Sequence, residues 1–316
     1  MVRKFVCILS AILLQVTVSF CSAQNDDFIS AKWKEGQMRE FRMEGTAFDV
    51  SEKGDTTYTS RGSYDFSVEV LKASDSGYEM RLNYPTSIYT SNMDINLSDI
   101  GDSIPIEFKT DEFGIFDRVT NTSFLAKLSE RLIEAAIKLP QLSSMDESDL
   151  RAMLKSYMSP ERMVQSFSQD IDVLFWVFGV AVKKGEKLTY ESEADMGNGM
   201  SIPTTTSILL EPDEEDKSLY IVDMVTDYDS KSLGPVLAQF LRQMMENVKD
   251  KGKYDQKEFE GFMSKSQMNL ADYYQSAVDV NTTWPLMSGY IREISIETPD
   301  GVQQKIQKRV IYSLDD

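Results

Sequence analysis

The chain has no histidine and only two cysteines, Cys7 and Cys21, both near the start of its 316 residues. Without histidine it lacks the commonest general base and the commonest transition-metal ligand in proteins. If the first 23 residues are removed, the remaining chain has no thiol either. These absences exclude histidine-dependent serine catalysis, cysteine catalysis, and zinc or copper sites.

The N-terminus has the parts of an export signal. Two basic residues precede an apolar stretch from residue 5 to residue 20, and small residues then lead to an expected cleavage site after Ala23. The stretch is interrupted by polar residues and is shorter than the roughly 20 residues of a membrane span. A second interpretation is a lipoprotein acylated at Cys21, although Phe20 stands where such motifs have a small residue. We expect an exported protein, periplasmic or on the outer surface, with no stable membrane span after cleavage.

The chain is strongly acidic, with 33 basic and 51 acidic side chains. This charge repels phosphate backbones, so we expect no nucleic-acid partner. The acidic run from Glu211 to Asp216 has no glycine and mostly consecutive acids, which favours a solvated hairpin tip over a calcium site. The acids around Gly114 likewise predict a turn capped by Asp111. We assign no metal and no cofactor.

Apolar residues alternate with polar ones in four segments of the first half, which is the period of half-buried strands. The first two segments flank the turn sequence 73–77 and predict a hairpin. The four expected strands cover 64–70, 78–84, 104–108 and 115–119.

Helical spacing then predicts three amphipathic helices between residues 123 and 170. An apolar run from 171 to 182 follows, with the length of a buried core segment. The expected helix starts are Asn121, a capping box of Ser144 and Glu147, and Ser159 followed by Pro160.

Strand periodicity resumes after residue 187 and returns near the C-terminus. A helix is expected over 234–249 and a short one from Asp255. The expected strands are 188–194, 201–210, 218–228, 271–280, 289–297 and 303–313. The sequence therefore predicts an α+β fold, in which antiparallel meanders of about ten strands carry amphipathic helices packed on the sheet.

The chain also divides into two parts that each run strands first and helices second. Both open with a lysine and a glycine before a strand, Lys34 with Gly36 and Lys184 with Gly185. This match favours two repeated halves, and two unrelated meanders are the alternative. The predicted divisions are a signal peptide at 1–23, a strand meander and helical cluster at 24–182, and strands with a helical insertion near 234–265 at 183–316.

A series of short motifs runs through most of the chain. They are Trp33-Lys34-x-Gly36, Gly77-Tyr78, Asp111-x-x-Gly114 with Asn121, Lys184-Gly185, and Thr283-x-Pro285. Their order resembles a group of uncharacterised exported proteins of Bacteroidetes-type bacteria, in which signal cleavage before glutamine, here Gln24, is also common. The resemblance implies an exported location and this architecture, and it brings no catalytic residues.

Paired carboxylates are the enzyme chemistry that this composition leaves open. Asp172, Asp223 and Asp279 each lie in an apolar sequence context, where burial would raise the pKa of a carboxyl group. An outward position on a strand or at a helix end is the competing interpretation for each. A carboxylate-dependent glycoside hydrolase acting on surface polysaccharide is therefore the alternative function.

Binding of an apolar ligand is the leading hypothesis. The chain has 17 methionines, whose flexible side chains adapt to irregular apolar shapes. The candidate ligand-binding residues are Phe240, Met244, Met245 and Phe262. Their competing role is to fill an ordinary core. A curved antiparallel sheet with helices against its concave face can enclose a lipid, as envelope lipoprotein carriers do. We expect a non-catalytic envelope protein that binds an apolar small molecule or an envelope protein, with a purely structural role in a surface assembly as a third possibility.

Overall fold

The computed structural model describes residues 29–51, 53–87, 101–139, 146–197, 200–236, 266–298 and 301–315. In this part of the chain, antiparallel strands form one sheet and three helices, α3 to α5, accompany it. Residues 230–236 are helical as well. None of the helices in these ranges combines the length and the apolarity that a membrane span requires.

The sheet consists of two meanders, which meet where the first strand of the chain pairs with the last. The first meander is β1 (Met38–Val50), β2 (Thr56–Ser74), β3 (Gly77–Pro85), β4 (Ser103–Thr110) and β5 (Phe116–Val119). The second is β6 (Lys187–Gly197), β7 (Met200–Pro212), β8 (Leu219–Tyr228), β9 (Gln267–Asp279), β10 (Pro285–Thr298) and β11 (Gly301–Ser313). Antiparallel pairing of β1 with β11 joins them, so the spatial order is β5-β4-β3-β2-β1-β11-β10-β9-β8-β7-β6. The sheet is therefore continuous across both halves.

The helices lie between the two meanders in sequence, and polar side chains cap the starts of two of them. They are α3 (Thr122–Ile137), α4 (Glu147–Tyr157) and α5 (Pro160–Phe175). The Ser159 side chain accepts a hydrogen bond from the Arg162 amide, and Pro160 occupies the first turn of α5, as predicted. The predicted capping box is wrong, because α4 begins at Glu147 itself, after Asp146. The Asp146 carboxylate accepts the Ser148 and Asp149 amides and caps the helix.

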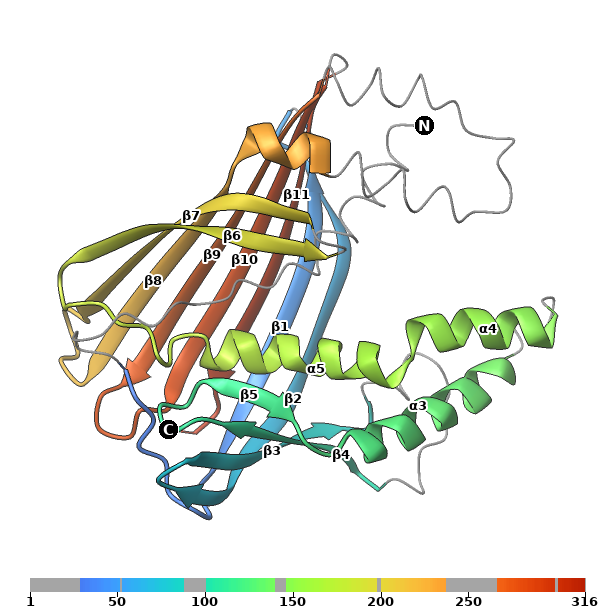
Figure 1. The fold of residues 1–316 in the computed structure, drawn as a ribbon, viewed down its shortest axis with the longest axis horizontal. Coiled ribbons are helices and arrows are strands. Elements are labelled where there is room, and N and C mark those ends of the chain that lie inside the picture. Colours follow the sequence, from blue (N-terminus) through green and yellow to red (C-terminus); the bar gives the residue numbers. More distant parts are fainter. Residues whose placement is uncertain are drawn as a thin grey trace.

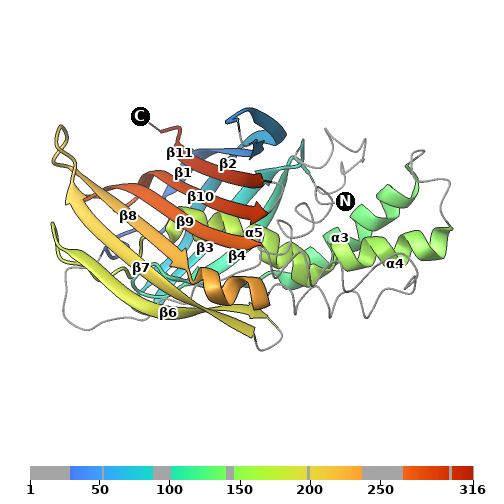
Figure 2. The same cartoon turned by 90° about the horizontal axis from the view of Figure 1, so that it is seen from above.

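The sheet curves around α5, which crosses its concave face (Figures 1 and 2). Helix α5 contacts β10, β11 and β5. The core lies in this concavity, where the inward residues of the predicted alternation are buried, among them Val68 and Val70 of β2 and Met80 and Leu82 of β3. The predicted apolar run 171–182 belongs to the same core, since most of its side chains are buried.

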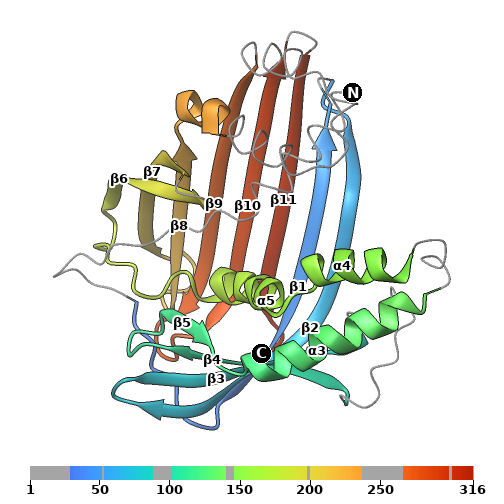
Figure 3. The same ribbon diagram turned by 45° about the vertical axis from the view of Figure 1, so that its right-hand side comes forward.

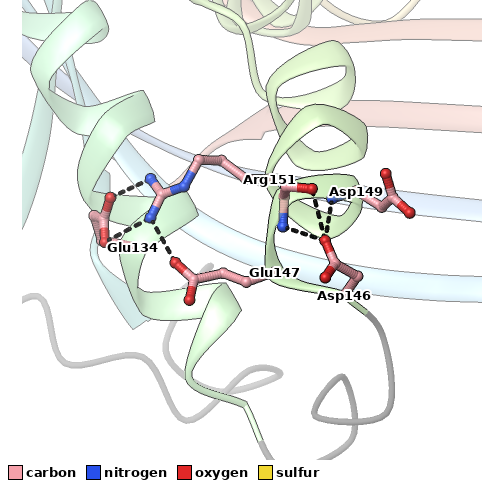
Figure 4. A network of polar contacts seen from close by, with 6 residues as sticks. Glu134, Asp146, Glu147, Asp149 and Arg151 are labelled. Carbon is pink, nitrogen blue, oxygen red and sulfur yellow. Dashed lines mark hydrogen bonds and ion pairs between the residues drawn. The ribbon is translucent and has the colours of Figure 1, made fainter.

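Helices α3 and α4 extend beyond one side of the sheet (Figure 3). A small apolar cluster of Ile133, Ala136, Leu150 and Leu154 holds them together. Figure 4 shows Arg151 of α4 between Glu134 of α3 and Glu147 of its own helix. These side chains are largely exposed, so the apolar cluster rather than the ion pairs stabilises the contact.

The sheet is more extensive than the sequence predicted. All ten expected strands are present, most of them longer than expected, and β1 is an additional strand that the alternation did not mark. The expected helix over 234–249 is described only as far as residue 236, and the one from Asp255 lies outside the described residues.

The two openings of the chain adopt the same turn. Gly36 and Gly185 both have φ near +80°, a left-handed conformation that glycine adopts without strain. The Gly36 amide donates to Val70 of β2, and the Gly185 amide donates to Leu210 of β7, at 2.9 and 2.8 Å. The residue after each glycine donates to the carbonyl three positions before it. The likeness between the two openings therefore extends from sequence to backbone hydrogen bonding.

Candidate functional site

A cavity of about 1050 Å³ lies between α5 and the inner face of the sheet. Its walls come from α5 and the residues that follow it, from β1, β2, β9, β10 and β11, and from the start of β5. Its volume is at the upper end of the range for small-molecule sites, which is roughly 300–1,000 Å³.

The cavity exists because the inner face of β1 and β2 loses its large side chains. Phe41 and Met43 are buried on this face, but the next two inward positions of β1 are Gly45 and Ala47. They pair with Gly62 and Ser60 of β2, which are also small. A Cβ atom on Gly62 would meet no other atom within 4 Å. Small residues on adjacent strands thus leave a hollow, and the pairing of β1 with β2 shifts register just beyond it, between Ala47 and Phe48.

Helix α5 presents a polar side to this hollow. Gln165, Ser168, Gln169 and Asp172 line the cavity and are spaced three or four residues apart, which places them on one side of the helix. The opposite side carries buried apolar residues, among them Phe167 and Leu174, that pack into the core. The helix therefore separates the apolar core from a partly polar cavity.

Aromatic rings form one end of the cavity. Trp176, directly after α5, packs on Tyr274 of β9 with ring centroids 5.5 Å apart, and Tyr274 packs on Tyr290 of β10 at 4.8 Å. Burial raises the pKa of both tyrosines, so they stay neutral. Trp176 is 6% exposed, and its Nε1 has no hydrogen-bond partner among the described residues. The buried Oε1 of Gln307, another lining residue, also has none in this part of the chain.

Two buried carboxylates next to the cavity are fully engaged. Asp170 of α5 accepts hydrogen bonds from Arg309 at 2.7 Å, from the Tyr64 hydroxyl at 2.5 Å and from the Tyr84 hydroxyl at 3.0 Å. This cluster ties α5 to β11, β2 and β3. Because the carboxylate has three donors, its charge is compensated inside the protein.

The second buried carboxylate lies within the sheet. Asp272 of β9 forms a two-pronged contact with Arg292 of β10, at 2.6 and 2.5 Å. The hydroxyls of Tyr228 and Tyr290 donate to the same carboxylate at 2.8 and 3.0 Å. Both arginines that reach the inner face near the cavity are therefore matched by an aspartate.

Asp172 differs from both. Its side chain is exposed by surface area, but that surface opens into the cavity, and the surrounding protein raises the pKa of the carboxyl group to about 6 through loss of hydration. No cation among the described residues forms an ion pair with it. Asp117, the other acid of the lining, pairs with Arg118.

Two further basic residues border the cavity without facing it. Arg61 of β2 and Lys308 of β11 both pair with Thr46 of β1. The adjacent set of paired residues is Gly62, Gly45 and Arg309, which faces the cavity. Because successive side chains of a strand point to opposite faces, Arg61 and Lys308 point to the outer face. In the described part of the chain, Asp172 is thus the one charged side chain of the cavity without an ion-pair partner.

The residues that the sequence proposed for ligand binding, Phe240, Met244, Met245 and Phe262, lie outside the described residues. Of the three acids in apolar contexts, two have structural roles. Asp223 accepts a hydrogen bond from Gln275 on the outer face, and Asp279 caps the turn after β9. Only Asp172 of these three lines the cavity.

The aromatic and acidic features of the sequence lie elsewhere. Trp33 and Trp284 are buried against each other in the core, with ring centroids 5.0 Å apart. In the acidic run between β7 and β8, Asp213 and Asp216 accept backbone amides of their own turn. Gly45 and Gly62, which leave the hollow in the sheet, and the polar side of α5 were not predicted from the sequence. The spacing of Gln165, Ser168, Gln169 and Asp172 was the available signal.

Comparison with known proteins adds little. No protein-family model and no curated protein matches the chain. Among solved structures, a loop L8 deletion mutant of OmpT, an outer membrane protein of Vibrio cholerae, aligns with 89% of this chain and 100% of its own at 10% identity. The TM-score of 0.20 is too low to support an inference about fold or function.

Proposed function

We propose that this chain is a non-catalytic, exported protein of the cell envelope that binds an amphipathic small molecule between α5 and the sheet. The observation that carries this proposal is the cavity of about 1050 Å³ on the concave face. The export signal at the N-terminus supports the location.

The lining supports a ligand with both apolar and polar parts. Aromatic rings at one end offer apolar contact, and the side of α5 offers amide, hydroxyl and carboxylate groups. The buried Trp176 Nε1 is a donor and Gln307 Oε1 an acceptor, and neither has a partner in the described ranges of the chain. Because unpaired buried polar groups cost free energy, a ligand that bonded to them would be stabilised.

The alternative, a carboxylate-dependent glycoside hydrolase, has less support. Such an enzyme needs two available acids, one of them with a raised pKa. Asp172 has the raised pKa, but the neighbouring Asp170 and Asp272 are held by arginine and tyrosine donors. A constellation of one available acid favours binding over hydrolysis.

A cavity-filling variant tests the proposal directly. Gly62→Leu places a side chain in open space at a position with ordinary backbone geometry, so it should fill the cavity without strain. Gly289→Leu is the matched control, because Gly289 lies in the same sheet and a Cβ there makes only an ordinary contact with the Gln275 carbonyl. Gly289 does not line the cavity.

The measurement is binding of the uncharged dye N-phenylnaphthylamine to residues 24–316, purified without detergent, together with native mass spectrometry of the same preparation. We expect dye fluorescence to rise on binding to the wild-type protein and to the control. The affinity of Gly62→Leu for the dye should be at least about tenfold lower. Absence of dye binding together with a bare polypeptide mass would contradict the proposal. Equal binding by all three proteins would place the ligand elsewhere and contradict the assigned site.

A further inference from the structure

We propose that the cavity selects an amphiphile whose polar group is a protonated amine, held between the Asp172 carboxylate and the rings of Trp176 and Tyr274. This inference rests on the proposed function, since it names the chemical class of the ligand for the same cavity. It follows from the placement of Asp172, from the rings beside it, and from the state of the nearby arginines.

Asp172 occupies an unfavourable position for an anion. It lies near the end of α5, where the aligned backbone dipoles carry partial negative charge. The last turn of this helix has no basic residue that would compensate. The surrounding protein reduces the hydration of the carboxylate and raises its pKa, which disfavours the charged form further. A cation supplied by a ligand would offset both effects at once.

The neighbouring rings suit an ammonium group. Trp176 follows Asp172 by four residues, so the indole lies on the same side of α5 as the carboxylate. Tyr274 packs on that indole, and Asp172, Trp176 and Tyr274 line the same cavity. A carboxylate flanked by aromatic rings is the arrangement that recognises alkylammonium ions through ion pairing and cation–π attraction.

The buried acceptor of Gln307 fits the same group. An ammonium has three donors and no acceptor, so it needs acceptors besides a single carboxylate. Gln307 of β11 pairs with Arg292 of β10, and no described residue donates to its buried side-chain oxygen. Further along α5, the polar side chains of Gln165 and Ser168 line the cavity and add acceptors.

Among the described residues, the two arginines that face the cavity offer no free charge to an anionic polar group. Arg292 is neutralised by Asp272, and Arg309 is neutralised by Asp170. A fatty acid carboxylate would therefore have to displace an internal aspartate or lie next to ionised Asp172. Both arrangements bring like charges together in a poorly hydrated space, which is unfavourable. The cavity thus discriminates by charge as well as by shape.

The test is a competition against N-phenylnaphthylamine by three amphiphiles with the same twelve-carbon chain, which are dodecylamine, dodecanol and dodecanoate. Each is used below its micelle-forming concentration at pH 7.5. We expect dodecylamine to compete about tenfold more tightly than dodecanol, with dodecanoate the weakest. Asp172→Asn should bring amine and alcohol within about threefold of each other. Asp117→Asn, which changes an ion-paired acid of the same lining, should preserve the wild-type order.

The outcomes separate the two proposals. If the dye and the amphiphiles bind but dodecanoate equals or exceeds dodecylamine, the amine selectivity is wrong while the binding function stands. An amine preference that survives in Asp172→Asn would also overturn the inference, because it would place the cation elsewhere. If neither the dye nor any amphiphile binds to the folded wild-type protein, the binding function itself fails. Circular dichroism of both asparagine variants confirms that they are folded.

Discussion

Two aspartates on one helix should respond in opposite ways to the same substitution. Asp170 and Asp172 are two residues apart on α5, and each becomes an uncharged isostere in Asp→Asn. Asp170 is 6% exposed and bound by Arg309 and two tyrosine hydroxyls. Asp172 has no such partner among the residues that the structure describes. The contrast isolates the effect of a partner from the effects of helix and position.

Asp170→Asn removes the charge that compensates Arg309. Breaking a buried ion pair by removing one partner costs about 3–5 kcal/mol of unfolding free energy. The Arg309 side chain is 29% exposed and can regain some hydration, so we expect the lower end of this range, about 3 kcal/mol. Replacing both partners, as in Asp170→Leu with Arg309→Met, should recover much of that loss, because no buried charge is left unpaired.

Asp172→Asn should stabilise the protein instead. The folded pKa is about 6, which is above the ordinary aspartate pKa, so the folded state binds the proton more tightly than the unfolded state. The destabilising contribution of this group is therefore absent below about pH 4 and complete above about pH 6. The full shift corresponds to about 3 kcal/mol, but Asp172 reaches water in the cavity. We therefore expect a gain of about 1 kcal/mol at pH 7 and none at pH 4.

The assay is urea denaturation of each variant at pH 7 and pH 4, with unfolding free energies from linear extrapolation. The reasoning would be refuted if the two asparagine variants shifted stability in the same direction at pH 7. It would also be refuted if the gain from Asp172→Asn were the same at both pH values. Arg292 and Arg309, the arginines on the inner face beside the cavity, stay charged throughout this range, so they leave the pH dependence to the carboxyl group.

Two further predictions concern the sheet. Gly77→Ala should cost more than about 2 kcal/mol in a urea titration, because φ is +122° and a Cβ would lie 2.1 Å from the Thr110 carbonyl oxygen, whereas Gly62→Ala should change stability by less than about 1 kcal/mol. Arg292→Met should lower the unfolding free energy by about 3–5 kcal/mol, since it leaves Asp272 buried and unpaired, and a stability equal to wild type would show that the tyrosine hydroxyls alone compensate the charge.

Much of the sheet could be predicted from the sequence because its inward positions are large and apolar. In β2 and β3 the alternation of Phe66, Val68, Met80 and Leu82 with polar residues matched the observed inward and outward faces. The helix start at Ser159 and Pro160 was equally readable, because capping is a local property of the chain. The start of α4 was predicted incorrectly, because Asp146, directly before the helix, caps it in place of the expected capping box.

The missed strand shows where this reasoning fails. In β1 the apolar alternation stops after Met43, because Gly45 and Ala47 follow on the inner face. The first half of β2, from Thr56 to Ser63, was missed for the same reason, since its residues are polar or glycine and exposed. These two segments form the floor of the cavity. A periodicity of large apolar residues marks a core, so it is silent where a sheet is built to leave space.

The candidate site could not be predicted from the sequence for a further reason, because it depends on how the strands pair. Asp170 and Asp172 both read as acids on an amphipathic helix, and only the registers of β11 and β10 decide which of them meets an arginine. The strands place Arg309 opposite Gly45, and from this position it binds Asp170. The next acid on the helix is then left facing the hollow with rings on one side. A charge that the fold leaves uncompensated, in a space that it leaves unfilled, is the arrangement that a bound cation would complete.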